Sequence, residues 1–93
     1  MALSTLGSMF TTGLSLNDES KAHRLDSPVH AVAIRAGITH RLFWRAGERT
    51  DGTPAVALFP LSNDGPLFAM DLAEFRDQPE TEIVRQIEVT LLS

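Results

Sequence analysis

The chain has 93 residues, no cysteine and a net charge of −4. Its length permits one domain, and the missing thiols exclude disulfides, thiolate catalysis and cysteine-ligated zinc. An acidic total disfavours a general nucleic-acid binder, and no stretch approaches the roughly 20 apolar residues that a membrane helix needs. We therefore expect a small cytoplasmic protein that binds no membrane.

The charges are unevenly distributed along the chain. Residues 21–49 hold six of the eight basic residues and carry a net +4, whereas residues 1–20 carry −2 and residues 50–93 carry −6. This uneven distribution predicts a surface that binds a charged partner.

Residues 1–26 differ in composition from the rest and are rich in Ser, Thr, Gly and Leu. Four apolar residues in this segment are spaced as on one face of a short helix: Leu3, Leu6, Met9 and Phe10. We expect an N-terminal arm over 1–26, packed on its own domain or on a neighbouring subunit. Residues 27–93 then form a single α+β domain.

The segment 29–35 fits two templates. Ser27 as N-cap, Pro28 at the first position and Gly37 beyond the end describe a short helix. The β-branched residues Val29, Val32 and Ile34 instead describe a strand. We favour the strand and keep the helix as the alternative.

A strand is predicted over 38–45, with alternate side chains on opposite faces: Ile38, His40, Leu42 and Trp44 on one, and Thr39, Arg41, Phe43 and Arg45 on the other. A loop over 47–54 follows. Residues 55–61 are apolar throughout, which predicts a central strand buried on both faces, with Pro60 forcing a bulge or an unpaired side. Asn63-Asp64-Gly65 predicts a hairpin turn, and 67–70 the returning strand.

Asp71 and Glu74 have the spacing of a capping box, which predicts a helical turn ending near Arg76. Pro79, followed by two glutamates, favours a second helix to the C-terminus. The fold class is thus α+β: a small antiparallel meander of three to four strands, a C-terminal helix packed on one face, and the arm. Because the last residues also alternate as a strand does, a mostly β fold with 82–92 as a further strand is the alternative.

One strand face carries the candidate binding residues. Arg41, Phe43 and Arg45 alternate along the predicted strand, with Arg35 beside them on its neighbour and Arg49 just beyond. Arginines around an aromatic ring can bind an acidic protein patch, or can stack bases and hold phosphates. In a purely structural alternative, the C-terminal helix covers Phe43 and the arginine stems lie at the rim.

Other residues give weaker indications. Trp44 is predicted in the core. The three histidines, His23, His30 and His40, match no metal-ligand spacing, and no nucleophile or phosphate-loop motif occurs. The acidic C-terminal third fits a solvated helix face better than a mimic of nucleic-acid phosphates.

We therefore expect no enzymatic activity, catalytic residue, cofactor or metal. The predicted function is a small protein-binding module, such as an inhibitor, adaptor or assembly subunit of the kind that phages and mobile elements encode. It would use Arg35, Arg41, Phe43, Arg45 and Arg49 together with the N-terminal arm, through which a homo-oligomer is plausible. The alternative is a single-stranded nucleic-acid binder that uses the same face.

Overall fold

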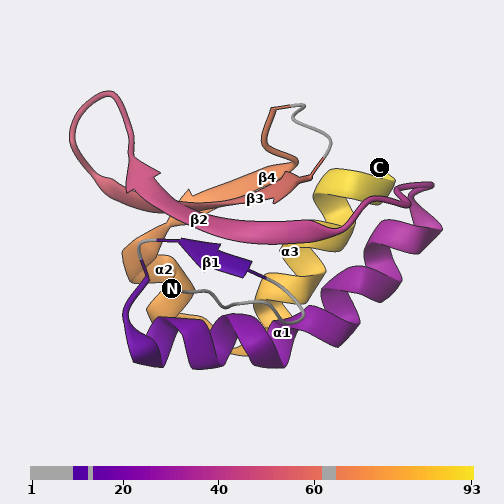
Figure 1. Cartoon of the computed structure of the whole chain (residues 1–93), viewed down its shortest axis with the longest axis horizontal. Coiled ribbons are helices and arrows are strands. Elements are labelled where there is room, and N and C mark those ends of the chain that lie inside the picture. The colour runs from indigo at the N-terminus through magenta and orange to yellow at the C-terminus, as the bar shows by residue number, and fades with distance from the viewer. Residues whose placement is uncertain (1–9, 13, 62–64) are drawn as a thin grey trace.

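In the computed structural model, a four-stranded sheet lies against three helices that all occupy one of its faces (Figure 1). The structure describes residues 10–12, 14–61 and 65–93. Within these ranges the elements follow one another in this order: β1 (Phe10–Thr12), α1 (Leu16–Arg35), β2 (Leu42–Glu48), β3 (Pro54–Pro60), β4 (Phe68–Asp71), α2 (Leu72–Asp77) and α3 (Glu80–Leu92).

The strands are ordered β1-β2-β3-β4. The expected antiparallel meander is formed by β2, β3 and β4, with Trp44 opposite Leu58 and Val56 opposite Met70. The edge strand β1 was assigned to the arm, but it pairs with β2 in parallel. Parallel neighbours need a crossover between them, and α1 supplies it.

The core lies between the sheet and the helices. Alternate residues of β2, β3 and β4 point into it, and helical residues meet them from below. The buried apolar residues are Ala22, Leu25, Val29, Val32, Ala33, Leu42, Trp44, Val56, Leu58, Phe68, Met70, Phe75, Ile83 and Ile87. The prediction that Trp44 is in the core is therefore confirmed, and its ring lies 5.3 Å from that of Phe75.

Helix α1 corrects two expectations. The segment 29–35 is helical rather than extended, and the boundary between 26 and 27 falls inside the helix. The helix begins after Ser15, whose hydroxyl oxygen accepts from the backbone N–H of Asp18 at 3.3 Å. It ends before Gly37, where φ is +82°. Since Ala22 and Leu25 are fully buried, residues 16–26 belong to the domain and not to an arm.

The helical pattern of α1 was present in the sequence. Ser15 and Asp18 have the spacing of a capping box, and the buried residues recur every three or four positions. In the helical alternative for 29–35, Ser27-Pro28 starts the helix, whereas Pro28 lies in the helix interior on an exposed position. The helical face expected from Leu3 to Phe10 lies outside the described residues, except that Phe10 is in a strand.

The strands differ from expectation in register and burial. β2 begins at Leu42, four residues later than predicted. β3 is buried on one face only, because its odd-numbered residues remain half-exposed. Pairing with β2 continues past Pro60, where the N–H of Leu61 donates to the carbonyl of Arg41 at 2.9 Å. On the other side the pairing of β3 with β4 ends at Leu58, so Pro60 has the unpaired side that was expected. The turn predicted at 63–65 lies mostly outside the described residues.

The C-terminal third follows the prediction more closely. α2 begins after Asp71, but the Asp71 side chain does not cap it; its Oδ1 accepts from Arg49 Nε at 2.6 Å instead. α3 is a helix, so the alternative strand over 82–92 is wrong. Ile83 and Ile87 lie one turn apart on its buried side.

Pro28 should lower the stability of the protein, and this effect can be measured. Proline has no N–H to donate, and its ring crowds the carbonyl four residues earlier in a helix. We expect Pro28→Ala to raise the free energy of unfolding in urea denaturation by about 1–3 kcal/mol. His30→Ala, an exposed change on the same helix, is the matched control and should have little effect. A less stable P28A variant would contradict the argument.

Candidate functional site

The face of the sheet turned away from the helices, called here the outer sheet face, is formed by the remaining side chains of β2, β3 and β4. The pairing places them in three rows. The first row is Phe43 and Phe59, the second is Arg45, Ala57 and Ala69, and the third is Gly47, Ala55 and Asp71. Rows on one face of a sheet are about 7 Å apart.

The aromatic row is half-exposed. The rings of Phe43 and Phe59 are stacked, with centroids 5.4 Å apart and an interplanar angle of 19°. The guanidinium carbon of Arg45 lies 5.7 Å from the centroid of Phe59, within reach of a cation–π interaction. Within the described ranges, Arg45 has no ion pair with a carboxylate.

A shallow hollow of about 330 Å³ lies over the second and third rows. Its floor consists of small residues, chiefly Gly47, Ala55, Ala57 and Ala69. Phe59 and Arg45 line it toward the aromatic row, and Glu48 and Arg49 line it toward the other end. Because alanine and glycine fill so little space, the hollow can receive a large apolar side chain from outside.

The five predicted site residues do not all lie on one face of the molecule. Phe43 and Arg45 belong to the outer sheet face, and Arg49 reaches its third row through Asp71. Arg41 precedes β2 and is exposed. Arg35 is the exception: it ends α1 in the helical layer, where its Nη1 lies 2.9 Å from Glu88 Oε2 of α3. The expectation that it neighbours Arg45 is wrong, because 29–35 is not a strand.

The two oppositely charged parts of the sequence meet inside the molecule. In the described residues, the ion pairs Arg24–Glu80, Arg35–Glu88 and Arg49–Asp71 each join the basic middle segment to the acidic C-terminal one. Several of the unevenly distributed charges therefore pair within the molecule, and only the others remain to bind an external partner. Sequence alone did not reveal this pairing.

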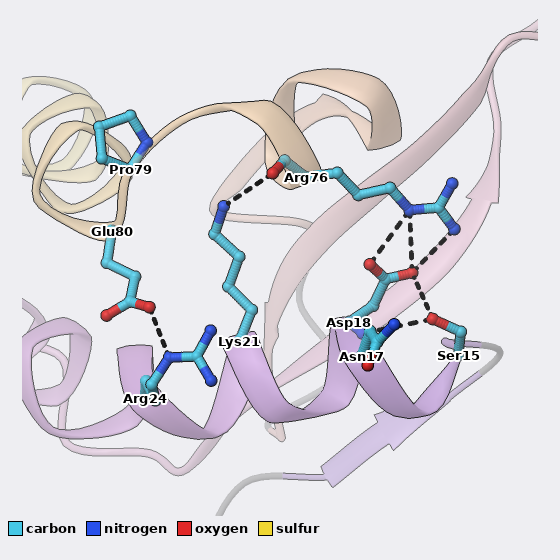
Figure 2. A pocket seen from close by; sticks show the side chains of 8 residues that line it. All are labelled: Ser15, Asn17, Asp18, Lys21, Arg24, Arg76, Pro79 and Glu80. Atoms are coloured by element: carbon cyan, nitrogen blue, oxygen red, sulfur yellow. Dashed lines mark hydrogen bonds and ion pairs between the residues drawn. The ribbon is translucent and has the colours of Figure 1, made fainter.

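A second concave region, the helix cleft, lies between α1 and the α2–α3 segment (Figure 2). It has a volume of about 580 Å³. The Nζ of Lys21 donates to the main-chain carbonyls of Arg76 and Gln78, and Arg24 Nε lies 2.5 Å from Glu80 Oε2. These contacts bind α1 to the α2–α3 segment.

Asp18 anchors the other end of the cleft and is only 3% exposed. Its carboxylate accepts from Arg76 Nη2 at 2.9 Å and from the Ser15 hydroxyl at 2.9 Å. The hydrogen bond from Arg76 is the main reason that the pKa of Asp18 lies below its usual value, although burial opposes the shift. The charges that line the cleft thus neutralise one another, and we assign it a structural role.

No group of three His, Cys, Asp or Glu side chains in the described residues is arranged to hold a metal ion. His23, His30 and His40 are all exposed. In the core, the indole N–H of Trp44 has no hydrogen-bond partner among the described residues. None of the described helices is long and apolar enough to cross a membrane.

Sequence reasoning missed Phe59 and the alanine floor. The sequence signal that could have identified them is the alternation of small and large residues in β3, which we interpreted as burial on both faces. Comparisons with protein-family models, with curated proteins and with solved structures returned no match. The candidate site therefore depends on its geometry alone.

The Asp18 ion pair makes stability dependent on pH. Because the pKa of Asp18 is lowered by folding, its stabilising effect is complete above the unfolded pKa of about 3.9 and is lost as the pH falls through the folded value. Asp18→Asn should reduce the free energy of unfolding by about 1–3 kcal/mol at neutral pH and flatten its fall below pH ~4.

Denaturant titrations between neutral pH and acid would measure both effects. Glu82→Gln is the control, because Glu82 also pairs with an arginine, but that pair lies on the surface. Its loss should be smaller, since solvent screens exposed pairs. An Asp18→Asn profile parallel to that of the wild type would refute the assignment.

Proposed function

We propose that the chain is a non-enzymatic protein-binding module and that the outer sheet face is its binding surface. The observation that carries this proposal is the one-sided helical layer. All three described helices pack on one face of the sheet, and none covers the aromatic row or the hollow. Aromatic rings and arginines beside a hollow are the residue types that anchor protein interfaces.

The chemistry of the face favours a particular kind of partner. Most of the surface is apolar, and Arg45 is a cation without a carboxylate partner among the described residues. A complementary protein surface therefore combines apolar side chains with an Asp or Glu near Arg45. An inhibitor, an adaptor or an assembly subunit can each bind in this way.

A second copy of the chain fits this face less well. Asp71, the carboxylate in the three rows, is already paired with Arg49. Two outer sheet faces packed on each other would thus bring arginines together, with Glu48 at the far end of the hollow as the carboxylate that no described ion pair uses. A homo-oligomer formed through the N-terminal arm remains a prediction, because residues 1–9 lie outside the described ranges. The cytoplasmic location remains a prediction too.

Single-stranded nucleic acid is the rival ligand, and the stacked pair Phe43 and Phe59 favours it. Phosphate binding needs several free cations. Of the five predicted residues, Arg35 lies in the helical layer and Arg49 is neutralised by Asp71. The outer sheet face therefore has fewer cations than the sequence predicted, which favours a protein over a nucleic acid as its ligand.

The variant Ala57→Glu tests the proposal directly. Ala57 lies at the centre of the outer sheet face, opposite Arg45, so a glutamate there fills the hollow and neutralises the arginine while the strands stay paired. A partner isolated with the wild-type chain, then purified and titrated calorimetrically, should bind A57E at least about tenfold more weakly.

Ile34→Ala is the matched control, because Ile34 is 58% exposed on α1, away from the sheet. It should bind like the wild type. Equal affinity of A57E and the wild type would remove the outer sheet face from the proposal. Fluorescence anisotropy with labelled single-stranded DNA and RNA at low salt completes the test. Tight binding that Phe59→Ala abolishes would establish the nucleic-acid alternative instead.

A further inference from the structure

The outer sheet face offers a partner side chains rather than backbone. β3 is paired along its length with β2 on one side and is paired with β4 from Ala55 to Leu58 on the other. β2 is paired with both β1 and β3 from Phe43 to Arg45. The N–H and C=O groups beneath the aromatic row and the hollow are therefore largely used within the sheet. A partner could extend the sheet only beyond an edge strand such as β4, so over the aromatic row and the hollow it binds across the surface.

This constraint selects the secondary structure of the partner. An extended segment laid flat on the face would bury its own N–H and C=O groups without hydrogen-bond partners, at considerable cost. An α-helix satisfies these groups internally and presents only side chains.

The spacing of the rows also suits a helix. Rows of the outer sheet face are about 7 Å apart, and residues one turn apart on a helix are separated by about 5–6 Å. A helix running along the strands can thus place one apolar residue in the hollow and the next against Phe59. A carboxylate on the same turn as the first residue then lies near Arg45, which lines the hollow.

We infer that the partner of the outer sheet face is an amphipathic α-helix. It places a large apolar side chain in the hollow over Ala57 and Ala69, and an Asp or Glu beside Arg45. This inference rests on the proposed protein-binding function and adds the structure and charge of the bound segment. The complex would have helices on both faces of the sheet.

Two display libraries provide the probes. One varies the surface positions of a stable helical hairpin, and the other presents unconstrained linear peptides of matched length. We expect selection against the full chain to enrich helical clones that carry a large apolar residue and, within one turn, an acidic residue. These clones should lose at least about tenfold in affinity for A57E and keep it for I34A.

Charge reversal tests the role of Arg45. A selected helical clone should bind Arg45→Glu about tenfold more weakly, and exchanging its acidic residue for lysine should restore much of that loss. Circular dichroism of each variant verifies the fold. Enrichment of linear clones alone, or helical clones that bind A57E and R45E as well as the wild type, would overturn the inference.

The two proposals fail in different ways. If a natural partner loses affinity for A57E while the helical library yields no such clone, the protein-binding function stands and the helical partner is wrong. If neither the natural partner nor any clone distinguishes A57E from the wild type, the binding surface itself is wrong. Self-association of the free chain that A57E abolishes, measured by sedimentation, would identify a second copy as the partner and overturn the helix.

Discussion

The packing of α1 against α3 and the sheet determines everything else in this molecule. Burial of Leu25, Val29, Ile83 and Ile87 contributes about 1.5–3 kcal/mol for each large side chain removed from water. The surrounding ion pairs are mostly exposed, so each contributes little stability. Their effect is rather to fix which flank of α1 faces α3. Once this layer is in place on one face, the other face of the sheet is available for something else.

Local patterns predicted the parts of the fold that depend on neighbours in the sequence. The alternation of Leu42 and Trp44 with Phe43 and Arg45 gave the correct faces of β2, and Pro79 gave the start of α3. α1 was missed because Val29, Val32 and Ile34 favour a strand in isolation, and because Pro28 signals at most the start of a short helix there. Tertiary packing overrides that signal, since the helix is held on both sides of the proline. The parallel pairing of β1 has no local signature.

The candidate site was only partly predictable, for a related reason. The alternation in β2 placed Phe43 and Arg45 on one face, but no local pattern shows which face the helices cover. Arg35 and Arg49 form ion pairs with Glu88 and Asp71, which are distant in sequence, so no local pattern shows that these arginines are paired. Charge segregation along a chain is consistent with an external partner and with internal pairing alike. Here internal pairing accounts for much of it, and the apolar surface becomes the more informative feature.

The position of Trp44 has a practical consequence. The chain contains one tryptophan and no tyrosine, so the near-ultraviolet emission arises almost wholly from this indole. The ring is sealed in the core against Phe75, on the opposite side of β2 from Phe43 and Arg45. Its fluorescence therefore follows unfolding and is insulated from ligands that dock on the far side of the strand. Binding to that side has to be followed with an attached label. The fluorescence of Trp44 then reports, in the same sample, whether the protein is folded.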